Sequence, residues 1–372
     1  MSSRLSERIV LAVDRLDGRR HTFGLLLTAL VERLAAQLEN FMLLRRRARA
    51  DLITARAPEL ILPSWLENHY AYAAFVALFL KRRGIDLIHY PFLYVPYTWW
   101  ATGIKRVVTI HGAARAALPH GLVERFHPLK LERYRRALPT FDAIITVSQA
   151  SKRDLIAHYR VPPEKIHVVY NGVSEAFRPD LDWQPTLARY GISRPYILSV
   201  STIKPKKNVL ATVKAYAEVK RRGLPHKLVL VGYKAPGYTA VDEAIEQLGL
   251  GHDVIQTGFV PAESVPCFYA GADLLVFPSL HEGFGLPVVE AFACGCPVVT
   301  SGVYALPEVA GDAALYCNPH DVADIGAKMI EVLTNDRLRE RLIQKGLARA
   351  RQFTLERYAE QTIAVYEQVL EH

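Results

Sequence analysis

The sequence is poor in the residues that usually build a metal centre or a disulfide framework. Its 372 residues include only four cysteines, at positions 267, 294, 296 and 317, and no two of them have CxxC spacing. No histidine pair accompanies them at a metal-ligand spacing. The pattern argues against a structural zinc site and against disulfides, and it favours buried, reduced thiols in a cytosolic protein.

Long apolar runs are also missing. The longest, Ala71–Leu80, has ten residues, which is too short to span a bilayer. Met1–Arg8 is polar and charged, so no apolar core of a signal peptide is present there. We therefore expect a cytoplasmic protein.

Negative charge is scarce in the first half of the chain. The formal net charge is +9, and residues 1–180 hold 27 Lys and Arg against 16 Asp and Glu, whereas the remainder is slightly acidic. A basic half suits an acidic membrane surface, an anionic acceptor or nucleic acid. An ordinary solvated surface would carry the same excess, and the charge count alone leaves these alternatives open.

Short β-branched runs alternate with helical patterns, which is typical of βαβ units and parallel sheets. Gly and Pro breakers in Asn171–Pro185 predict a connector. We expect two Rossmann-like α/β domains, residues 1–180 and 190–354, facing each other across a cleft at the carboxyl ends of their sheets. A helix at about 355–372 is expected to pack back on the first domain. Strands are expected at residues 8–13, 86–89, 106–111, 142–147, 195–200, 227–232, 254–258, 273–278 and 297–300, and helices at 22–37, 65–82, 149–158, 207–221, 237–248, 262–270 and 286–294, with helical periodicity from 321 to 370.

The most informative stretch is Ser279–Thr300 (SLHEGFGLPVVEAFACGCPVVT). Two carboxylates, Glu282 and Glu290, flank a Gly-x-Gly turn that lies between a strand-like run and a helix. Such a turn offers backbone N–H groups and the positive end of a helix to an anion. Pro287 suits a first helical turn, where a missing N–H costs nothing. Because Glu290 lies about one turn further in, it would meet a polyol attached to the bound phosphate, and the stretch predicts a site for a nucleotide diphosphate that carries a sugar.

The tract from Gly258 through Glu290 resembles the retaining GT-B glycosyltransferases of family 4, whose hallmark is a Glu-x7-Glu pair, here Glu282 and Glu290. The resemblance implies a GT-B fold and transfer of a sugar from a GDP- or UDP-sugar with retention at the anomeric carbon. It implies no metal and no separate cofactor, since protein groups neutralise the leaving diphosphate. The single Asp-x-Asp, Asp180–Asp182, lies in the connector and disfavours a metal-dependent transferase of the other main fold. Similar segments are Val147–Leu155, Val161–Val173, Ile197–Asn208 and Leu306–Ala314.

The resemblance also assigns roles to side chains. Lys206 and Lys207 would clamp the diphosphate, although adjacent lysines at a helix start are otherwise commonly just solvated. Thr202 stands where many relatives have arginine, which makes Lys206 the candidate substitute for that cation. Glu290 would bind ribose hydroxyls, with helix-dipole stabilisation of at most about 1 kcal/mol as its alternative role. Glu282 would face the donor sugar, either as a hydrogen-bond acceptor, which we favour, or as the nucleophile of a double displacement.

Other predicted contacts are less specific. His111 follows a strand where the family often places a histidine against the donor sugar, and we count it with Glu282 and Lys207 as catalytic. The base is expected near Phe259–Val260 and Gly232–Tyr233. The alternative is that these residues are only strand ends that belong to the core. Backbone N–H groups for sugar and phosphate are expected from Gly283, Phe284, Gly285 and Leu286.

The loop Asp17–Gly24 departs from the family pattern. Relatives commonly have closely spaced glycines after the first strand, whereas here the glycines are separated by bulky residues that include Arg19, Arg20 and His21. These side chains would meet an anionic acceptor or form an exposed loop, and the sequence does not decide between the two.

The predicted protein is a retaining hexosyltransferase (EC 2.4 class), with mannose favoured, that acts on a glycan or lipid-linked acceptor. Basic tracts at Arg45–Arg47 and Lys81–Arg83 predict peripheral attachment to the inner face of an anionic membrane. The alternative is a non-catalytic GT-B subunit that binds a nucleotide or scaffolds a partner enzyme, which the presence of both Glu282 and Glu290 disfavours. Nucleic-acid binding is disfavoured, because the sequence has no motif that would enter a DNA groove or stack on bases. The donor base, the acceptor, the linkage and the oligomeric state stay open.

Overall fold

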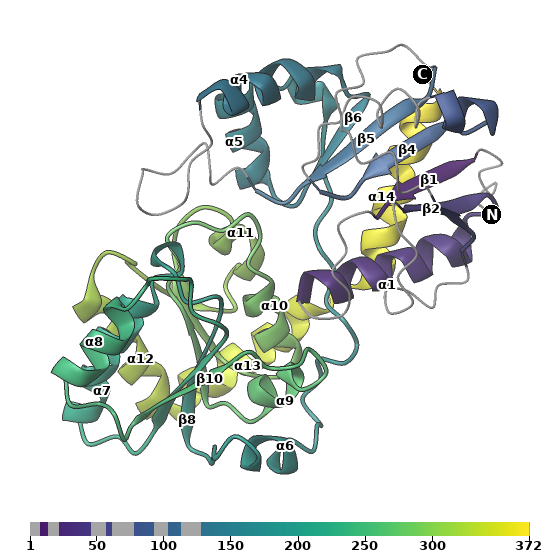
Figure 1. Cartoon of the computed structure of the whole chain (residues 1–372). Helices are drawn as coiled ribbons and strands as arrows, with labels where there is room; N and C mark the ends of the chain where they lie inside the picture. The colour runs from purple at the N-terminus through teal and green to yellow at the C-terminus, as the bar shows by residue number, and fades with distance from the viewer. Residues whose placement is uncertain are drawn as a thin grey trace. The chain divides into compact units, whose positions relative to one another are not determined.

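The computed structural model describes residues 8–13, 22–45, 57–61, 78–92, 103–112 and 128–371. They divide into two α/β units (Figure 1). The first unit holds the described residues up to Gly172 together with Leu355–Glu371, and the second holds Val173–Thr354. The chain thus passes from one unit to the other at the start of the predicted connector and returns after Thr354.

The first unit is built on a parallel sheet of seven strands in the order β3-β2-β1-β4-β5-β6-β7. Leu11 of β1 lies in register with Leu43 of β2 on one side and with His89 of β4 on the other. The strands are β1 (Ile9–Ala12), β2 (Phe41–Arg45), β3 (Glu59–Ile61), β4 (Leu87–Tyr90), β5 (Lys105–Ile110), β6 (Ala143–Thr146) and β7 (Ile166–Val168). The unit includes the α-helices α1 (Thr22–Gln37), α4 (Pro128–Ala137), α5 (Gln149–Tyr159) and α14 (Leu355–Glu371), and residues 78–82, at the end of a predicted helix, are helical as well.

The second unit has a parallel six-stranded sheet in the order β10-β9-β8-β11-β12-β13. Its strands are β8 (Tyr196–Val200), β9 (Lys227–Val231), β10 (Val254–Gly258), β11 (Leu274–Phe277), β12 (Val298–Ser301) and β13 (Leu315–Cys317). Its helices are α6 (Gln184–Ala188), the 3-10 turn η5 (Pro205–Lys207), α7 (Val209–Arg221), α8 (Ala240–Gln247), α9 (Val265–Ala270), α10 (Leu286–Ala293), α11 (Leu306–Ala310), α12 (Val322–Thr334) and α13 (Asp336–Ala350).

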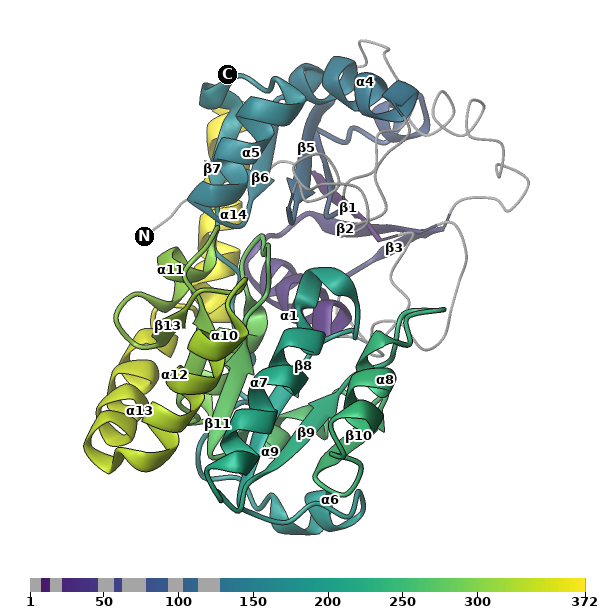
Figure 2. The same ribbon diagram turned by 90° about the vertical axis from the view of Figure 1, so that its left-hand side faces the viewer.

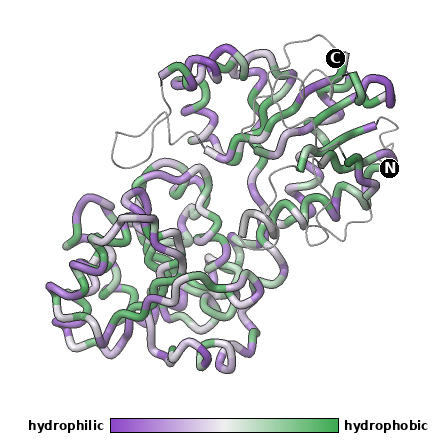
Figure 3. Tube along the Cα trace, viewed as in Figure 1, coloured by the Kyte–Doolittle hydropathy of each residue, from purple (hydrophilic) through white to green (hydrophobic). Residues whose placement is uncertain are grey.

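Both faces of the second sheet are covered by helices. Successive strand residues alternate between two apolar clusters, as Leu274 and Leu275 of β11 do, because side chains along a strand point to opposite faces. Helices α7, α8 and α12 cover one face and α9 and α10 the other, and Figure 2 shows α7 and α8 lying over the strands. In Figure 3 hydrophobic residues are coloured green, and much of the trace along the strands has this colour. Burial on both faces explains why an inner strand such as β11, LLVF, is a continuous apolar run.

The C-terminal helix α14 packs on α1, β5 and β6 of the first unit. Arg33 of α1 is 2.7 Å from Glu356, and the buried Tyr366 hydroxyl is hydrogen-bonded to His89 Nδ1 at 2.6 Å. The other ring nitrogen of His89 is 2.7 Å from Thr109 Oγ1. Burial, with a smaller effect of His111, lowers the pKa of His89 to about 3. A neutral imidazole is therefore enclosed between the sheet and the last helix.

The sequence predicted most of the longer elements and missed several short ones. Thr22–Gln37 and Val254–Gly258 have the predicted bounds. Strands β2, β3, β7 and β13 and helices α4, α6 and α11 were not predicted. Strands β3, β7 and β13 have three residues each, too few for a period to be recognised. Their pairing with neighbouring strands, rather than their own sequence, makes them strands.

Candidate functional site

The predicted donor residues follow the carboxyl ends of neighbouring strands in the second unit. Lys206 and Lys207 come after β8, Gly232 after β9, Phe259 after β10 and Glu282 after β11. This edge is where ligands bind in open α/β sheets. The tertiary structure therefore brings residues that are up to 76 positions apart in the sequence, from Lys206 to Glu282, to one edge of a single sheet.

The segment Gly283–Leu286 forms the turn from β11 into α10 and is shaped by Gly285. The backbone of Gly285 has φ +103°, and a Cβ on it would lie 2.6 Å from Leu306 Cδ2. Both the backbone conformation and the lack of space therefore favour glycine at this position. Pro287 lies in the first turn of α10, as predicted. Phe284 is buried, and its ring lies edge-on to Phe353 with the ring centres 5.5 Å apart. Only the backbone of Phe284 could therefore contact a ligand.

Glu282 is an ionised carboxylate in a buried position. Its side chain is 9% exposed, and Oε1 lies 2.7 Å from Lys207 Nζ; the Ser279 hydroxyl donates to the same oxygen. Burial by itself would raise the pKa of Glu282, but Lys207, Lys206 and these hydrogen bonds lower it to about 2. The carboxylate therefore stays ionised across the physiological range, and it accepts hydrogen bonds but does not donate them.

The two predicted lysines have different surroundings. Lys207 is paired with Glu282, and its Nζ lies 5.1 Å from the centre of the Phe277 ring. Within the described part of the chain, no carboxylate forms a direct ion pair with Lys206. Burial lowers the pKa of Lys206, against a smaller raising effect of nearby Glu282. The carbonyl of Lys206 accepts the N–H of Leu280 at 2.9 Å. The ammonium group of Lys206 could thus bind an anion. The loop that carries it is hydrogen-bonded to the segment before Glu282.

Asn208 holds the lysine loop in place. Its backbone is left-handed, with φ +58°, a conformation that Asn tolerates better than most residues. Its Nδ2 donates to the carbonyls of Pro278 at 3.1 Å and Pro319 at 2.7 Å. The side chain therefore ties the loop after β8 to the segments after β11 and β13. The sequence did not predict this role, although an Asn directly after two lysines at a helix start was a usable signal.

Replacing Asn208 is expected to destabilise the second unit in two steps. Asn208→Gly keeps the left-handed backbone but loses both hydrogen bonds, which costs about 1–3 kcal/mol. Asn208→Ala adds backbone strain of roughly 1 kcal/mol. Urea unfolding followed by fluorescence measures both variants, and equal stability of the Gly and Ala variants would contradict the strain argument.

Glu290 lies inside α10 and is 2% exposed. The Tyr269 hydroxyl donates to its Oε2 at 2.7 Å. Burial raises the pKa of Glu290 to about 7, against the lowering effect of the Tyr269 hydrogen bond. The two motif carboxylates therefore differ, because Lys207 keeps Glu282 charged whereas no cation pairs with Glu290 in the described structure. Nothing in the sequence pointed to Tyr269, which is 21 residues away.

Two exposed aromatic rings follow adjacent strands. Tyr233 after β9 and Phe259 after β10 are each 49% exposed, and the N–H of Gly232 donates to the carbonyl of Gly258 at 2.9 Å. A Cβ on Gly232 would lie 2.0 Å from the Ser201 carbonyl oxygen, so the chains approach too closely here for any side chain.

Two other predicted donor residues lie deeper. Val260 is 5% exposed and belongs to the apolar core of the unit. A donor contact there falls to its backbone. Thr202 is half-buried in the loop after β8.

His111 belongs to the first unit, directly after β5. Its Nε2 lies 3.0 Å from the Pro91 carbonyl oxygen, which makes Nε2 the protonated nitrogen of a neutral ring. Burial lowers the pKa of His111 to about 4, although the Pro91 hydrogen bond raises it. A neutral imidazole at this strand end suits hydrogen bonding rather than ion pairing, and its contact with substrate stays a prediction.

Several predictions fall outside the described residues. These are the segment 17–21 of the N-terminal loop, Arg46 and Arg47 of the first basic tract, and residues 65–77 of a predicted helix. In the described ranges, no group of three or more His, Cys, Asp or Glu could hold a metal ion. None of the described helices is long and apolar enough to cross a membrane.

Comparison with known proteins decides the family. Residues 189–349 match the model of the glycosyl transferases group 1, and residues 14–177 match that of glycosyltransferase family 4. The O-antigen chain mannosyltransferase B of Escherichia coli is 32% identical over 314 residues, which cover 77% of this chain and 81% of the relative. The chain belongs to the family 4 glycosyltransferases.

Solved structures agree with this glycosyltransferase in fold. A glycosyltransferase from Rickettsia africae ESF-5 has a TM-score of 0.79 at 17% identity, covering 99% of this chain and 100% of that one. Anabaena Alr3699/HepE in complex with UDP-glucose has a TM-score of 0.76 at 20% identity, covering 97% and 99%. The predicted two-domain α/β GT-B architecture is thereby confirmed, and so is the family assigned from the Glu-x7-Glu tract.

Proposed function

We propose that this glycosyltransferase transfers a hexose, with retention of configuration, from a nucleotide diphosphate sugar to a glycan or lipid-linked acceptor. The observation that carries the proposal is the buried Lys207–Glu282 pair with Lys206 beside it, next to the glycine turn of α10. Breaking a sugar–phosphate bond builds negative charge on the leaving diphosphate, and preorganised cations and N–H dipoles stabilise that charge. The two ammonium groups supply it without a metal ion.

Groups at this edge of the sheet suit the successive parts of such a donor. The exposed rings of Tyr233 and Phe259 suit stacking by a nucleobase. The buried carboxyl of Glu290 suits the two ribose hydroxyls. Mannose is the hexose we favour, because the relative that is 32% identical is a mannosyltransferase. A UDP-sugar is the alternative to a GDP-sugar, since the Anabaena protein of the same fold holds UDP-glucose.

The proposed reaction proceeds on one face of the sugar. The acceptor hydroxyl oxygen forms a bond to the anomeric carbon while the bond from that carbon to the phosphate oxygen breaks, and the hydroxyl proton moves to the departing phosphate oxygen. Glu282 accepts a hydrogen bond from a sugar hydroxyl. Its pKa of about 2 and its contacts with Lys207 and Ser279 make it a weak nucleophile, which disfavours a double displacement.

A donor screen tests the proposal. Purified protein is titrated with GDP-mannose, UDP-glucose, UDP-N-acetylglucosamine and the free diphosphates, and thermal unfolding is followed. A true donor at 100-fold excess over its Kd stabilises the protein by about 2.7 kcal/mol. Hydrolysis or transfer should persist in EDTA, and the product linkage, read by NMR, should keep the donor's anomeric configuration. Absence of any binding sugar nucleotide would leave the proposal without support.

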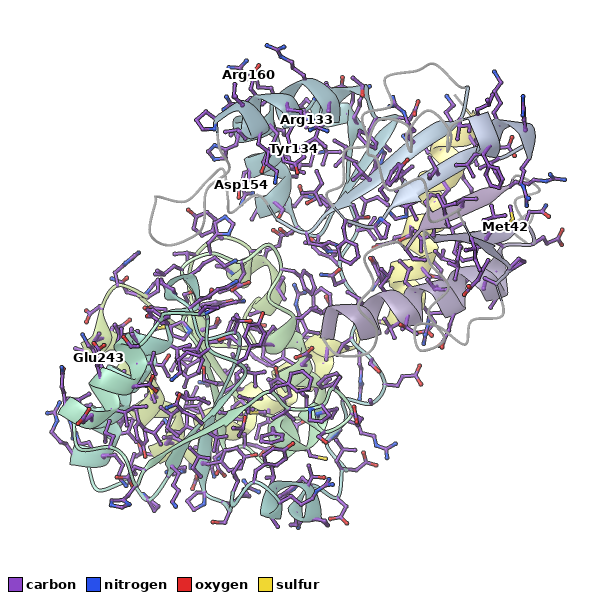
Figure 4. The ribbon with its side chains drawn as sticks, viewed as in Figure 1. Met42, Arg133, Tyr134, Asp154, Arg160 and Glu243 are labelled. Atoms are coloured by element: carbon purple, nitrogen blue, oxygen red, sulfur yellow. The ribbon has the colours of Figure 1, made fainter. Side chains whose placement is uncertain are left out.

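We also propose attachment to an anionic membrane through the basic first unit. Lys81 and Arg82 are exposed, and further basic residues lie on α4 and at the end of α5, among them Arg133 and Arg160 (Figure 4). Leu129 on α4 is 76% exposed, an apolar contact of the kind that interfacial helices use.

Co-sedimentation with phosphatidylglycerol vesicles is expected to fall steeply between about 50 and 300 mM salt, because exposed charges are screened. Lys81→Glu/Arg82→Glu should weaken binding several-fold, whereas the matched charge reversals Lys214→Glu/Arg221→Glu on α7 of the second unit should not. Binding that ignores salt, or equal loss in both double variants, would contradict attachment by this surface.

A further inference from the structure

Tyr304, in the loop between β12 and α11, has an unusual backbone. Its φ is +53°, a left-handed conformation that is a genuine outlier for a bulky residue. Such conformations persist only where the surroundings over-determine them, and they cluster at ligand sites. The side chain is nevertheless 40% exposed. Its ring is thus held at the surface in a conformation that glycine would adopt without strain.

The neighbours of Tyr304 explain how the loop is fixed but not why the ring is exposed. Ala305 and Leu306 are fully buried, and Leu306 fills the space that a side chain on Gly285 would occupy. The β12–α11 loop and the Glu282 turn therefore interlock. Tyr304 itself belongs to none of the apolar clusters of the unit, so core packing does not account for it.

The Tyr304 ring lies against His281, the residue directly before Glu282. The ring centres are 4.1 Å apart at 44°, and His281 is only 1% exposed. One side of the tyrosine ring thus rests on a buried imidazole, which fixes its orientation. The exposed part of the ring is open to a ligand.

The strand order indicates which part of a donor would lie there. Along the order β10-β9-β8-β11-β12 come the exposed aromatic rings, then the lysines, then Glu282, then Tyr304. The base, the diphosphate and the sugar follow the same order in a nucleotide sugar, while the ribose is assigned to Glu290, which lies on α10 and not in one of these loops. The loop after β12 is therefore at the sugar end, beyond Glu282.

We propose that Tyr304 contacts the transferred hexose and selects for it, with its ring packed on the C–H face of the sugar. This inference rests on the proposed function. A neutral aromatic ring suits the apolar face of a hexose and offers little to a diphosphate, whose charge the two lysines meet. Tyr304 is then a specificity-determining residue whose backbone strain is retained for a ligand contact.

The test compares Tyr304→Gly with Tyr304→Phe. Glycine removes the ring and relieves the strained φ, while phenylalanine keeps the ring and the strain. Calorimetric Kd values are measured for GDP, UDP, GDP-mannose and UDP-glucose, together with the thermal midpoint of each protein. We expect the Gly variant to bind the diphosphate as the wild type does, to bind the sugar nucleotide about tenfold more weakly, and to unfold at the same or a higher temperature. The Phe variant should keep wild-type affinities.

Equal affinity of wild type and the Gly variant for the sugar nucleotide would overturn the inference and leave the proposed function intact. Parallel loss of diphosphate and sugar nucleotide would also overturn it, since the ring would then only shape the loop. A fall in the thermal midpoint would show that Tyr304 merely covers His281. A wild-type protein that binds the diphosphate but no sugar nucleotide would overturn the proposed function itself, and with it this inference.

Discussion

Lys207→Met is expected to lower kcat about 100- to 1,000-fold, the usual effect of removing one preorganised group that faces developing charge. The ammonium of Lys207 is held at 2.7 Å from Glu282 Oε1 in a largely buried position. Because it is already oriented, little free energy is needed to reorient it when the diphosphate leaves. Methionine keeps the length of the side chain and removes the charge. Single-turnover kinetics with the donor identified by the screen measure the effect on chemistry apart from binding.

The same substitution is expected to destabilise the second unit. Glu282 would remain buried without its cation, and breaking one side of such a pair costs about 3–5 kcal/mol. The double variant Lys207→Met/Glu282→Gln should recover most of this stability, because no uncompensated charge remains, but it should stay inactive. Activity and stability are thus separated by one double-mutant cycle.

Lys214→Met on the exposed face of α7 is the matched control. It removes the same charge from the same type of side chain and should change neither kcat nor the unfolding midpoint. A double variant that regains activity along with stability would show that Lys207 is needed only to neutralise the charge of Glu282, and its proposed role at the leaving diphosphate would then be wrong.

Donor affinity is expected to rise with pH through the titration of Glu290. Its pKa is about 7 because of burial, and the ionised carboxylate is the better acceptor for two ribose hydroxyls. Affinity for the diphosphate should therefore increase about tenfold between pH 6 and pH 8. Glu290→Gln should bind about 10- to 100-fold more weakly at pH 8, the loss of hydrogen bonds to a charged group, and should show a flat pH profile. Isothermal titration at four pH values gives both results.

Folding stability should change with pH in the opposite direction. The folded state holds the Glu290 proton more tightly than the unfolded state, whose value is 4.5. Stability is therefore fully present below pH 4.5 and is lost as pH rises through 7, by about 3 kcal/mol in total. Glu290→Gln removes this loss, so the variant should be the more stable protein at pH 8. Comparing urea midpoints of variant and wild type at pH 5 and pH 8 measures the difference.

Tyr269→Phe provides the conservative check. The Tyr269 hydroxyl is the group that lowers the pKa of Glu290, so its removal should move the affinity profile to higher pH while keeping the fold. A profile that stays in place in Tyr269→Phe, or that persists in Glu290→Gln, would assign the titration to another group.

The sequence predicted the long, periodic elements well because their information is local. Helix α1 and strand β10 could be placed to the residue, since hydrophobic period and breakers mark them. The three-residue strands β3, β7 and β13 could not be placed, because a strand that short is defined by the neighbour it pairs with. Helix α4 has a mostly polar sequence, PLKLERYRRA, and its tertiary contacts with α5 are absent from any local pattern.

The candidate site divides in the same way. The sequence by itself determined the family, the glycine turn and the identity of the two carboxylates, because spacing along one strand–turn–helix is a local property. Only the tertiary structure showed that Lys207 and Ser279 stabilise the ionised form of Glu282. It likewise showed that Tyr269 is the hydrogen-bond partner of Glu290, whose pKa is about 7. It also decided that Asn208 and Tyr304 belong to this edge of the sheet. Charge state and orientation depend on what surrounds a side chain, and parallel strands bring those surroundings from distant parts of the chain.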